Sequence, residues 1–461
     1  MKLISVLIVF IFTVSKIHGL ESSACKICSC SDGNLDCSSR KLEHHLNDTD
    51  LEGTTFQLVN FDQNLIIHLK AFPVMTAVKL SFRHNGITVI DQAAFRQVKN
   101  LTEIDLSHNH LTSKELKPHC FMGTYSPENY EPLSSLKILR LSGNSLHTLH
   151  PDIFEHLPNL RELSLDSNPF KVIDKLTTIA IASQQQLQVL DLSSIKISKL
   201  PTTMLHTPRY LEVLNLSSNA FKSIPISIGE AEESLRVLIL DNNPITHIDS
   251  IPLLKNLEVL HINYMQELVN ISSGALKKLP RLKELSICHN PNLQHIAENA
   301  LSGEEHEQEW PPLQKLYINN NKLGYLGQAF LSRWDHLTDL DVSMNPWVCD
   351  CKNQWFLSTL VPQFSSVNNQ KAFYMMCDEP EEMRGRSLVN LSRASVEMRC
   401  LDIRGSRPEK DALVLVAVLI GLLLAVPLAM ALFALYQRIY GQTSPLVRFS
   451  YHRASFVDTL S

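Results

Sequence analysis

The 461-residue sequence has no excess of basic residues: 42 Lys and Arg stand against 47 Asp and Glu, and the formal net charge is −5. This balance argues against nucleic acid as a partner. Glycine is scarce, at 15 residues, which excludes collagen-like repeats. With 44% hydrophobic residues the chain can build a large core, which excludes wholesale disorder. The sequence has no nucleophile elbow, phosphate-binding loop or H-E-x-x-H motif, so we predict no enzyme, no metal and no cofactor.

Two apolar segments predict the membrane topology. At 1–19, Lys2 precedes a mainly apolar run that is too short to cross a bilayer and is typical of a secretory signal peptide. An uncleaved anchor is the alternative. The segment 412–436 has no charged residue and is long enough to span the hydrocarbon core as a helix. Because the charges on the two sides of this segment are similar, the prediction of its orientation rests on the signal peptide. We expect a single-pass type I protein of the plasma membrane, with an extracellular amino terminus and a short cytoplasmic tail at 437–461.

A repeated pattern, L-x-x-L-x-L-x-x-N-x-L, fills most of the chain between these segments. One clear copy begins at Leu101. The asparagine of the pattern recurs at Asn85, Asn109, Asn144, Asn168, Asn219, Asn243, Asn290, Asn321 and Asn345. Most copies lie about 24 residues apart, and a unit of this size cannot bury its apolar face alone. The period therefore predicts a solenoid of stacked repeats.

Three copies depart from the pattern. Ile195 and Met265 occupy the asparagine position in two of them, and a degraded copy is expected around Leu58 and Leu65. A buried asparagine can satisfy backbone groups of its turn through the side-chain amide. Isoleucine and methionine cannot, so we expect those two turns to be looser or differently hydrogen-bonded.

Eight of the ten cysteines flank the repeats in two groups. The groups are Cys25, Cys28, Cys30 and Cys37 before the repeats and Cys349, Cys351, Cys377 and Cys400 after them. Spacing alone leaves three pairings open within each group, and four cysteines could instead bind zinc. The oxidising compartment that a signal peptide implies favours disulfides over zinc.

The repeats and their flanking cysteines resemble those of extracellular leucine-rich repeat proteins of the typical 24-residue class. The resemblance implies an α/β solenoid, a horseshoe with a parallel concave sheet, disulfide caps and one transmembrane helix. It also implies the disulfides Cys25–Cys30, Cys28–Cys37, Cys349–Cys377 and Cys351–Cys400. The expected division is a signal peptide at 1–19, an amino-terminal cap at 20–50, repeats at 51–347, a carboxy-terminal cap at 348–401, a juxtamembrane linker at 402–411, the transmembrane helix at 412–436 and the tail at 437–461.

The residues between the buried leucines are expected to form ladders on the concave face, about 4.8 Å apart from strand to strand. These ladders are charged at their ends and apolar in the middle. The candidate ligand-binding residues are Val213, Val237, Ile239, Val259, His261, Tyr264 and Tyr317. An exposed apolar patch is typical of a partner site. The alternative is that valine occurs there because it favours strand geometry.

Five N-x-[S/T] sequons predict a glycoprotein. They are Asn47, Asn100, Asn215, Asn270 and Asn390. A glycan on Asn215 would lie beside the valines and shift binding toward the carboxy-terminal repeats or a flank.

An insertion from Ser113 to Pro132 lengthens one step of the repeat and is expected to form a projecting loop, a second candidate surface. It contains Cys120. The other unassigned cysteine, Cys288, follows Ile287 and is expected to face away from the core. Two interpretations stay open for these cysteines: unreactive free thiols, or an intermolecular disulfide through one of them.

We therefore expect a cell-surface receptor or co-receptor that binds an extracellular or cell-surface protein and recruits a longer-tailed signalling partner. The alternative is a cell-adhesion protein that acts by homophilic or heterophilic contact. Both functions suit the same horseshoe and the same short tail.

Overall fold

The computed structural model describes residues 23–126, 129–302, 310–331, 336–362, 364, 369–372, 374–400 and 408–440. The predicted signal peptide lies outside the described residues, as do 402–407 of the predicted linker and 441–461 of the predicted tail. By its internal contacts the chain divides into two units, Met1–Cys349 with Asn353–Val396 and Asp350–Lys352 with Glu397–Ser461.

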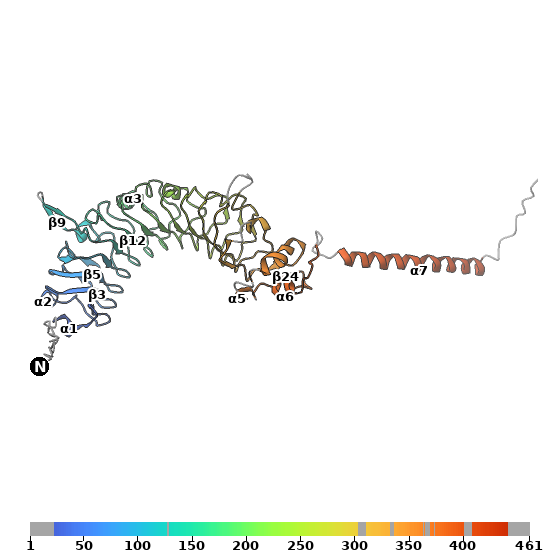
Figure 1. Ribbon diagram of the computed structural model, residues 1–461, viewed down its shortest axis with the longest axis horizontal. Helices are drawn as coiled ribbons and strands as arrows, with labels where there is room; N and C mark the ends of the chain where they lie inside the picture. Colours follow the sequence, from blue (N-terminus) through green and yellow to red (C-terminus); the bar gives the residue numbers. More distant parts are fainter. Residues whose placement is uncertain are drawn as a thin grey trace, which may run out of the picture. The chain divides into compact units, whose positions relative to one another are not determined.

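The larger unit is a solenoid of stacked strands (Figure 1). Its main sheet has 15 strands within the described residues, and all neighbours pair in parallel except β1 and β2. The strands are β1 (Ser29–Ser31), β2 (Asn34–Asp36), β3 (Thr55–Asn60), β5 (Met75–Ser81), β7 (Val98–Lys99), β8 (Glu103–Asp105), β11 (Ile138–Arg140), β12 (Glu162–Ser164), β13 (Val189–Asp191), β14 (Val213–Asn215), β15 (Val237–Ile239), β17 (Val259–His261), β19 (Glu284–Ser286), β21 (Lys315–Tyr317) and β22 (Asp339–Asp341). The predicted leucine-rich repeat solenoid is confirmed.

The connections between these strands contain only short helices and short strands among the described residues. The smaller sheets pair β4 (His68–Leu69) with β6 (Val89–Ile90), β9 (Thr124–Ser126) with β10 (Asn129–Glu131), β23 (Trp347–Val348) with β24 (Cys377–Glu379), and β18 (Asn270–Ile271) with both β16 (His247–Ile248) and β20 (His295–Ile296). Among the described residues, the helices of this unit are α1 (Ala24–Ile27), α2 (Asp48–Leu51), η1 (Pro118–Phe121), α3 (Lys175–Ala182), η2 (Ile226–Ala231), η3 (Gln328–Leu331), η6 (Phe356–Leu360), α5 (Asn369–Ala372) and α6 (Leu388–Arg393). The residues of η5 (Cys351–Asn353) are divided between the two units. In Figure 1 the solenoid is curved, with β12 on its inner side and α3 on its outer side.

The regularly spaced leucines form the core because side chains along a strand point alternately to its two faces. The central residue of each short strand is buried, as Leu190, Leu214 and Leu238 show at 0% exposure. The two residues that flank it are half-buried and face the concave side. Each of these strands thus contributes one buried leucine to a continuous core and two side chains to the concave surface, and the leucines that flank the strand in the repeat are buried as well.

A ladder of buried asparagines holds the turns together, as the sequence predicts. Asn109 donates from Nδ2 to the carbonyl oxygens of Phe82 (2.9 Å) and Leu106 (3.0 Å). Its Oδ1 accepts from the backbone N–H of Ile87 (3.1 Å), two residues beyond the asparagine of the preceding turn. The residue before it, His108, has a φ of 56°. The amide bonds therefore link neighbouring turns at a point where the backbone is left-handed.

The variant turn of Ile195 is differently bonded, as predicted. Where Ile195 replaces the asparagine, the Phe170 N–H donates to the Asn168 carbonyl (3.0 Å) instead of a side-chain amide. The N–H of Met265 donates to Asn290 Oδ1 (2.8 Å), as the N–H of Asn290 does to Asn321 Oδ1 (2.9 Å), so this bond does not distinguish the other variant turn. The degraded copy is also confirmed: Asn64 is its asparagine and accepts from the N–H of Leu42 (3.0 Å).

Disulfides lie at both ends of the repeats. The structure joins Cys25 to Cys30, Cys28 to Cys37, Cys349 to Cys377 and Cys351 to Cys400, the pairing that the resemblance implies. After the last repeat, Trp347 is 1% exposed and donates from Nε1 to the Val342 carbonyl (3.1 Å). An apolar core that would otherwise end at solvent is thus covered at this end.

The smaller unit contains one long helix, α7 (Pro408–Tyr440). Its segment Ala412–Tyr440 is long and apolar enough to cross a membrane. Pro427 lies inside it, which a membrane helix tolerates. The predicted span at 412–436 falls within this segment. Together with the disulfides, the helix indicates a membrane-anchored extracellular protein.

Candidate binding surface

The valines of the concave face lie directly opposite one another on neighbouring strands. Val213 pairs with Val237, and Val237 pairs with Val259. On the adjacent ladder, Ile239 pairs with His261. All five side chains are half-buried. Because parallel strands in register lie about 4.8 Å apart, these residues form one continuous patch, which we call the apolar ladder.

The apolar ladder begins one strand earlier than the patch predicted from the sequence. Val189 on β13 pairs with Val213 and is also half-buried. It occupies the same position of the repeat as the other valines, so the repeat pattern alone could have added it.

Two of the proposed residues lie apart from the apolar ladder. Tyr264 lies in the turn after β17, next to Met265, and is 51% exposed. Its ring stacks on His289 with the ring centroids 4.7 Å apart. Tyr317 lies on β21 and is separated from β17 by β19 with its polar residue Glu284. The structure therefore brings together five of the seven predicted residues.

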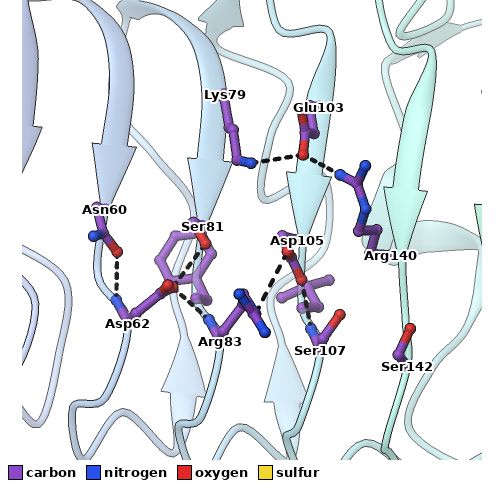
Figure 2. Close-up of polar contacts among 12 residues, drawn as sticks. Asn60, Asp62, Lys79, Ser81, Arg83, Glu103, Asp105, Ser107, Arg140 and Ser142 are labelled. Atoms are coloured by element: carbon purple, nitrogen blue, oxygen red, sulfur yellow. Dashed lines mark hydrogen bonds and ion pairs between the residues drawn. The ribbon is translucent and has the colours of Figure 1, made fainter. Parts of the chain in front are cut away.

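Before the apolar ladder, the concave face carries paired charges. Lys79 Nζ lies 2.8 Å from Glu103 Oε1, and Glu103 also forms an ion pair with Arg140 (Figure 2). Arg140 reaches on to Glu162, with 3.6 Å between Nη2 and Oε2. The side chain of Glu103 is only 16% exposed. We call these four residues the charged ladder; each of its charges has an opposite charge on the next strand.

A second polar row runs beside the charged ladder, at the ends of the strands. Asp62 Oδ1 accepts from the Ser81 hydroxyl and the Arg83 N–H, both at 2.7 Å. Arg83 in turn lies 3.8 Å from Asp105, which accepts from the N–H of Ser107 (3.0 Å), as Figure 2 shows. These carboxylates already accept hydrogen bonds within the sheet, so their oxygens do not depend on a partner protein for hydrogen bonds.

Polar pairing resumes at His261, the residue at the end of the apolar ladder. His261 lies 3.4 Å from Glu284, and Glu284 pairs with Lys315 at 3.0 Å. The patch therefore ends at β19, where the first of these carboxylates appears.

Tyr317 belongs to a polar cluster that the carboxy-terminal cap completes. Its hydroxyl donates to Asp339 Oδ2 (2.8 Å), and Lys371 Nζ lies 5.3 Å from its ring centroid. Lys371 also lies 3.5 Å from both Asp339 and Asp341. Burial, and then the hydrogen bond to Asp339, raise the pKa of Tyr317 above its usual range. The phenol is a fixed hydrogen-bond donor rather than part of an apolar contact surface.

The five sequons differ in exposure. Asn47, Asn100 and Asn390 are exposed, whereas Asn215 and Asn270 are half-buried. Asn215 donates to Asp191 Oδ2 (3.0 Å) and accepts from the N–H and hydroxyl of Ser217. Its amide is therefore engaged within the concave face, beside Val213.

The two cysteines outside the disulfides are buried thiols. Cys120 is 0% and Cys288 is 7% exposed. Burial raises the pKa of both thiols, which lowers the thiolate fraction. These surroundings favour unreactive free thiols over an intermolecular disulfide. Within the described part of the chain, no group of three or more His, Cys, Asp or Glu side chains is arranged to hold a metal ion.

Comparison with known proteins agrees with the repeat assignment. A family model for the leucine rich repeat matches residues 77–126 and 125–170. The P-granule-associated novel protein 1 of Caenorhabditis elegans is 34% identical over 87 residues. This match covers 18% of the present chain and 13% of that protein.

Solved structures with a similar arrangement have low sequence identity. A chain of the octameric complex of Latrophilin 3, Unc5D and FLRT2 is 19% identical with a TM-score of 0.44, over 78% of this chain and 96% of that one. A leucine-rich repeat protein of Leptospira interrogans is 23% identical with a TM-score of 0.49, over 72% and 82%. A chain of the Drosophila Toll–Spatzle complex is 17% identical with a TM-score of 0.43, over 76% and 56%.

The leucine-rich repeats, the solenoid, the disulfides and the single apolar helix together fit an extracellular leucine-rich repeat protein with one membrane span.

Proposed function

We propose that this protein is a cell-surface receptor or co-receptor that binds an extracellular protein through the apolar ladder. The observation that carries the proposal is the run of half-buried aliphatic side chains from Val189 to Val259, on four consecutive strands. Polar pairs border this run on both sides, at Glu162 and at Glu284.

The energetic reason lies in what a partner must displace. Covering an aliphatic side chain removes apolar surface from water and stabilises a complex by about 25 cal/mol per Å². Covering the charged ladder would instead desolvate ion pairs, which offsets much of the gain. A partner therefore gains most over the apolar ladder, with the charged borders limiting its placement.

We also propose that the solenoid is extracellular and that 437–461 is cytoplasmic, with 1–19 removed as a signal peptide. The disulfides support this orientation because they form in oxidising compartments. An epitope tag placed after Leu20 should stain on intact cells, and a tag at the carboxy terminus only after permeabilisation. The reverse staining pattern would contradict the orientation.

Cell mixing tests the function. Cells that express the full chain are mixed with differently labelled cells that lack it, and a soluble Fc fusion of residues 20–401 is applied to a panel of other cells. The receptor function predicts that expressing cells stay dispersed while the fusion stains a subset of the panel. Sorting of expressing cells into clusters with one another would instead establish homophilic adhesion.

A further inference from the structure

We propose that the insertion at Ser113–Pro132 and the following repeat form a second binding site, a cationic cavity that takes an acidic side chain of a partner protein. The cavity has a volume of about 750 Å³. It lies apart from the concave sheet, since the residues that line it belong to the insertion and to the loops after the sheet strands. Those residues are Ser113, Lys114, Lys117, Pro118, His119, Met122, His150, Glu155 and His156.

Hydrogen bonds fix one wall of the cavity to the next turn of the solenoid. The Ser113 hydroxyl donates to the Thr148 carbonyl (2.7 Å) and accepts from the N–H groups of His147 (2.9 Å) and Thr148 (3.0 Å). The N–H of Leu133, just after the insertion, donates to the carbonyl of His156 (2.9 Å). Both ends of the insertion are therefore held in place before any partner binds.

The hairpin of the insertion is also anchored. Tyr130 donates from its hydroxyl to the Glu155 carbonyl (2.8 Å), and its ring lies 5.1 Å from that of His156. Gly123 approaches the carbonyl of Glu131 too closely for any side chain, so the two strands of the hairpin require glycine there. The cavity is thus a built feature with a volume within the usual range for ligand sites, about 300–1,000 Å³.

The charge of the cavity favours an anion. Lys117 is exposed and forms no ion pair with any residue that the structure describes, and Lys114 has only Glu115 at 3.8 Å. His119, His150 and His156 line the same cavity, and Glu155 is the single carboxylate among the lining residues that the structure describes. An incoming carboxylate would find Lys117 without an ion-pair partner among the described residues, beside Lys114 with its long pair to Glu115.

The apolar part of the lining distinguishes a peptide from a polyanion. Pro118 and Met122 offer a surface for an aliphatic or aromatic side chain next to the acidic one. Among the described residues, the lining contains two lysines and no arginine, whereas a sulfated polysaccharide would need a longer row of cations. We therefore assign the cavity to an acidic segment of a protein that also carries an apolar residue.

Fluorescence anisotropy with the full-length protein in detergent micelles tests this site. The probe is a fluorescein-labelled peptide, Asp-Glu-Phe-Glu-Asp, and its neutral counterpart is Asn-Gln-Phe-Gln-Asn. We expect the acidic peptide to bind at least tenfold more tightly than the neutral one. The double variant Lys114→Glu with Lys117→Glu should weaken binding of the acidic peptide at least tenfold.

The matched control carries the same change of charge elsewhere. Lys199 and Lys222 are exposed, so Lys199→Glu with Lys222→Glu should leave the affinity within twofold. Equal binding of both peptides, equal loss in both double variants, or binding of heparin without binding of the acidic peptide would overturn the proposal. The double variant Val237→Arg with Ile239→Arg should leave peptide binding unchanged, because these residues belong to the apolar ladder and not to the cavity. Loss of peptide binding in that variant would place the peptide on the concave face and overturn the assignment of the peptide to the cavity.

Discussion

The charged ladder and the apolar ladder occupy the same positions of the same repeat, yet they present opposite chemistry. On β5, β8, β11 and β12 the concave positions hold Lys79, Glu103, Arg140 and Glu162, each paired with a neighbour. On β13, β14, β15 and β17 one of the two positions is always valine. The turns after β14 and β15 keep the buried asparagine of the charged region, whereas those after β13 and β17 carry Ile195 and Met265 instead. Since valine stands on all four strands, the asparagine of the turn does not dictate this difference. The chemistry of the concave surface therefore varies over a repeated pattern of buried aliphatic residues.

The largest expected effect is a loss of stability on replacing a buried asparagine, which occurs in both regions. Asn109 lies next to the charged ladder and Asn219 next to the apolar ladder; each is buried and bonded to backbone groups of two turns. Replacing either with alanine leaves buried backbone groups unpaired, and we expect a loss of about 3 kcal/mol in each case. Urea denaturation measures this loss. The exposed Asn159→Ala should cost under about 1 kcal/mol, and unequal losses at Asn109 and Asn219 would show that the scaffold is not common to both regions.

The next largest effect should be confined to the apolar ladder. Val237→Arg with Ile239→Arg places two charges in the patch, and we expect partner binding to weaken about 100-fold, or about 2.8 kcal/mol. Binding of the Fc fusion to positive cells measures it. Val172 and Ile226 are exposed aliphatic residues outside the main sheet, at 67% and 86%. Their double replacement by arginine is the matched control, and a similar loss there would remove the special role of the apolar ladder.

A smaller effect is expected in the charged ladder. Glu103→Gln removes the carboxylate that Lys79 and Arg140 share, while Arg140 retains Glu162 at 3.6 Å. We expect a loss of about 1 kcal/mol in stability, decreasing at high salt, and no change in partner binding. Denaturation at two ionic strengths provides the measurement. Weaker partner binding by this variant would place the partner on the charged ladder instead.

The smallest effect is expected at Asn215. Its amide is engaged with Asp191 and Ser217, and the position is half-buried, so we predict no glycan there. Asn215→Gln should leave the electrophoretic mobility unchanged and partner binding within threefold. Asn47→Gln, at an exposed sequon, should increase mobility and serves as the positive control. A mobility change for Asn215→Gln together with tighter binding would show that a glycan covers part of the apolar ladder.

The repeat pattern could predict most of the fold because it encodes the core directly. The leucine spacing places Leu190, Leu214 and Leu238 inward, and the same spacing aligns Val213 with Val237. The asparagine bonds and their disturbance at Ile195 also follow from the chemistry of one side chain. Local periodicity was sufficient wherever the contact lies one repeat away.

Contacts outside the repeat could not be predicted in this way. Tyr317 has the sequence position of a concave residue, but its partner Lys371 comes from a segment beyond the repeats, so its removal from the apolar surface has no local signal. The cavity beside Ser113 likewise depends on how the insertion meets Thr148 in the next turn. The length of the insertion predicts a projecting loop, but its charge and its anchoring depend on tertiary structure.

Site-specific photocrosslinking tests the central claim most directly. A benzoyl-phenylalanine is introduced in the full-length protein at Val237 or at Ile138, which are both half-buried and hold the same position of the repeat in the two regions. On illumination of cells that carry the partner, we predict a crosslinked protein for the probe at Val237 and none for the probe at Ile138. A crosslink at Ile138 without one at Val237 would contradict binding through the apolar ladder.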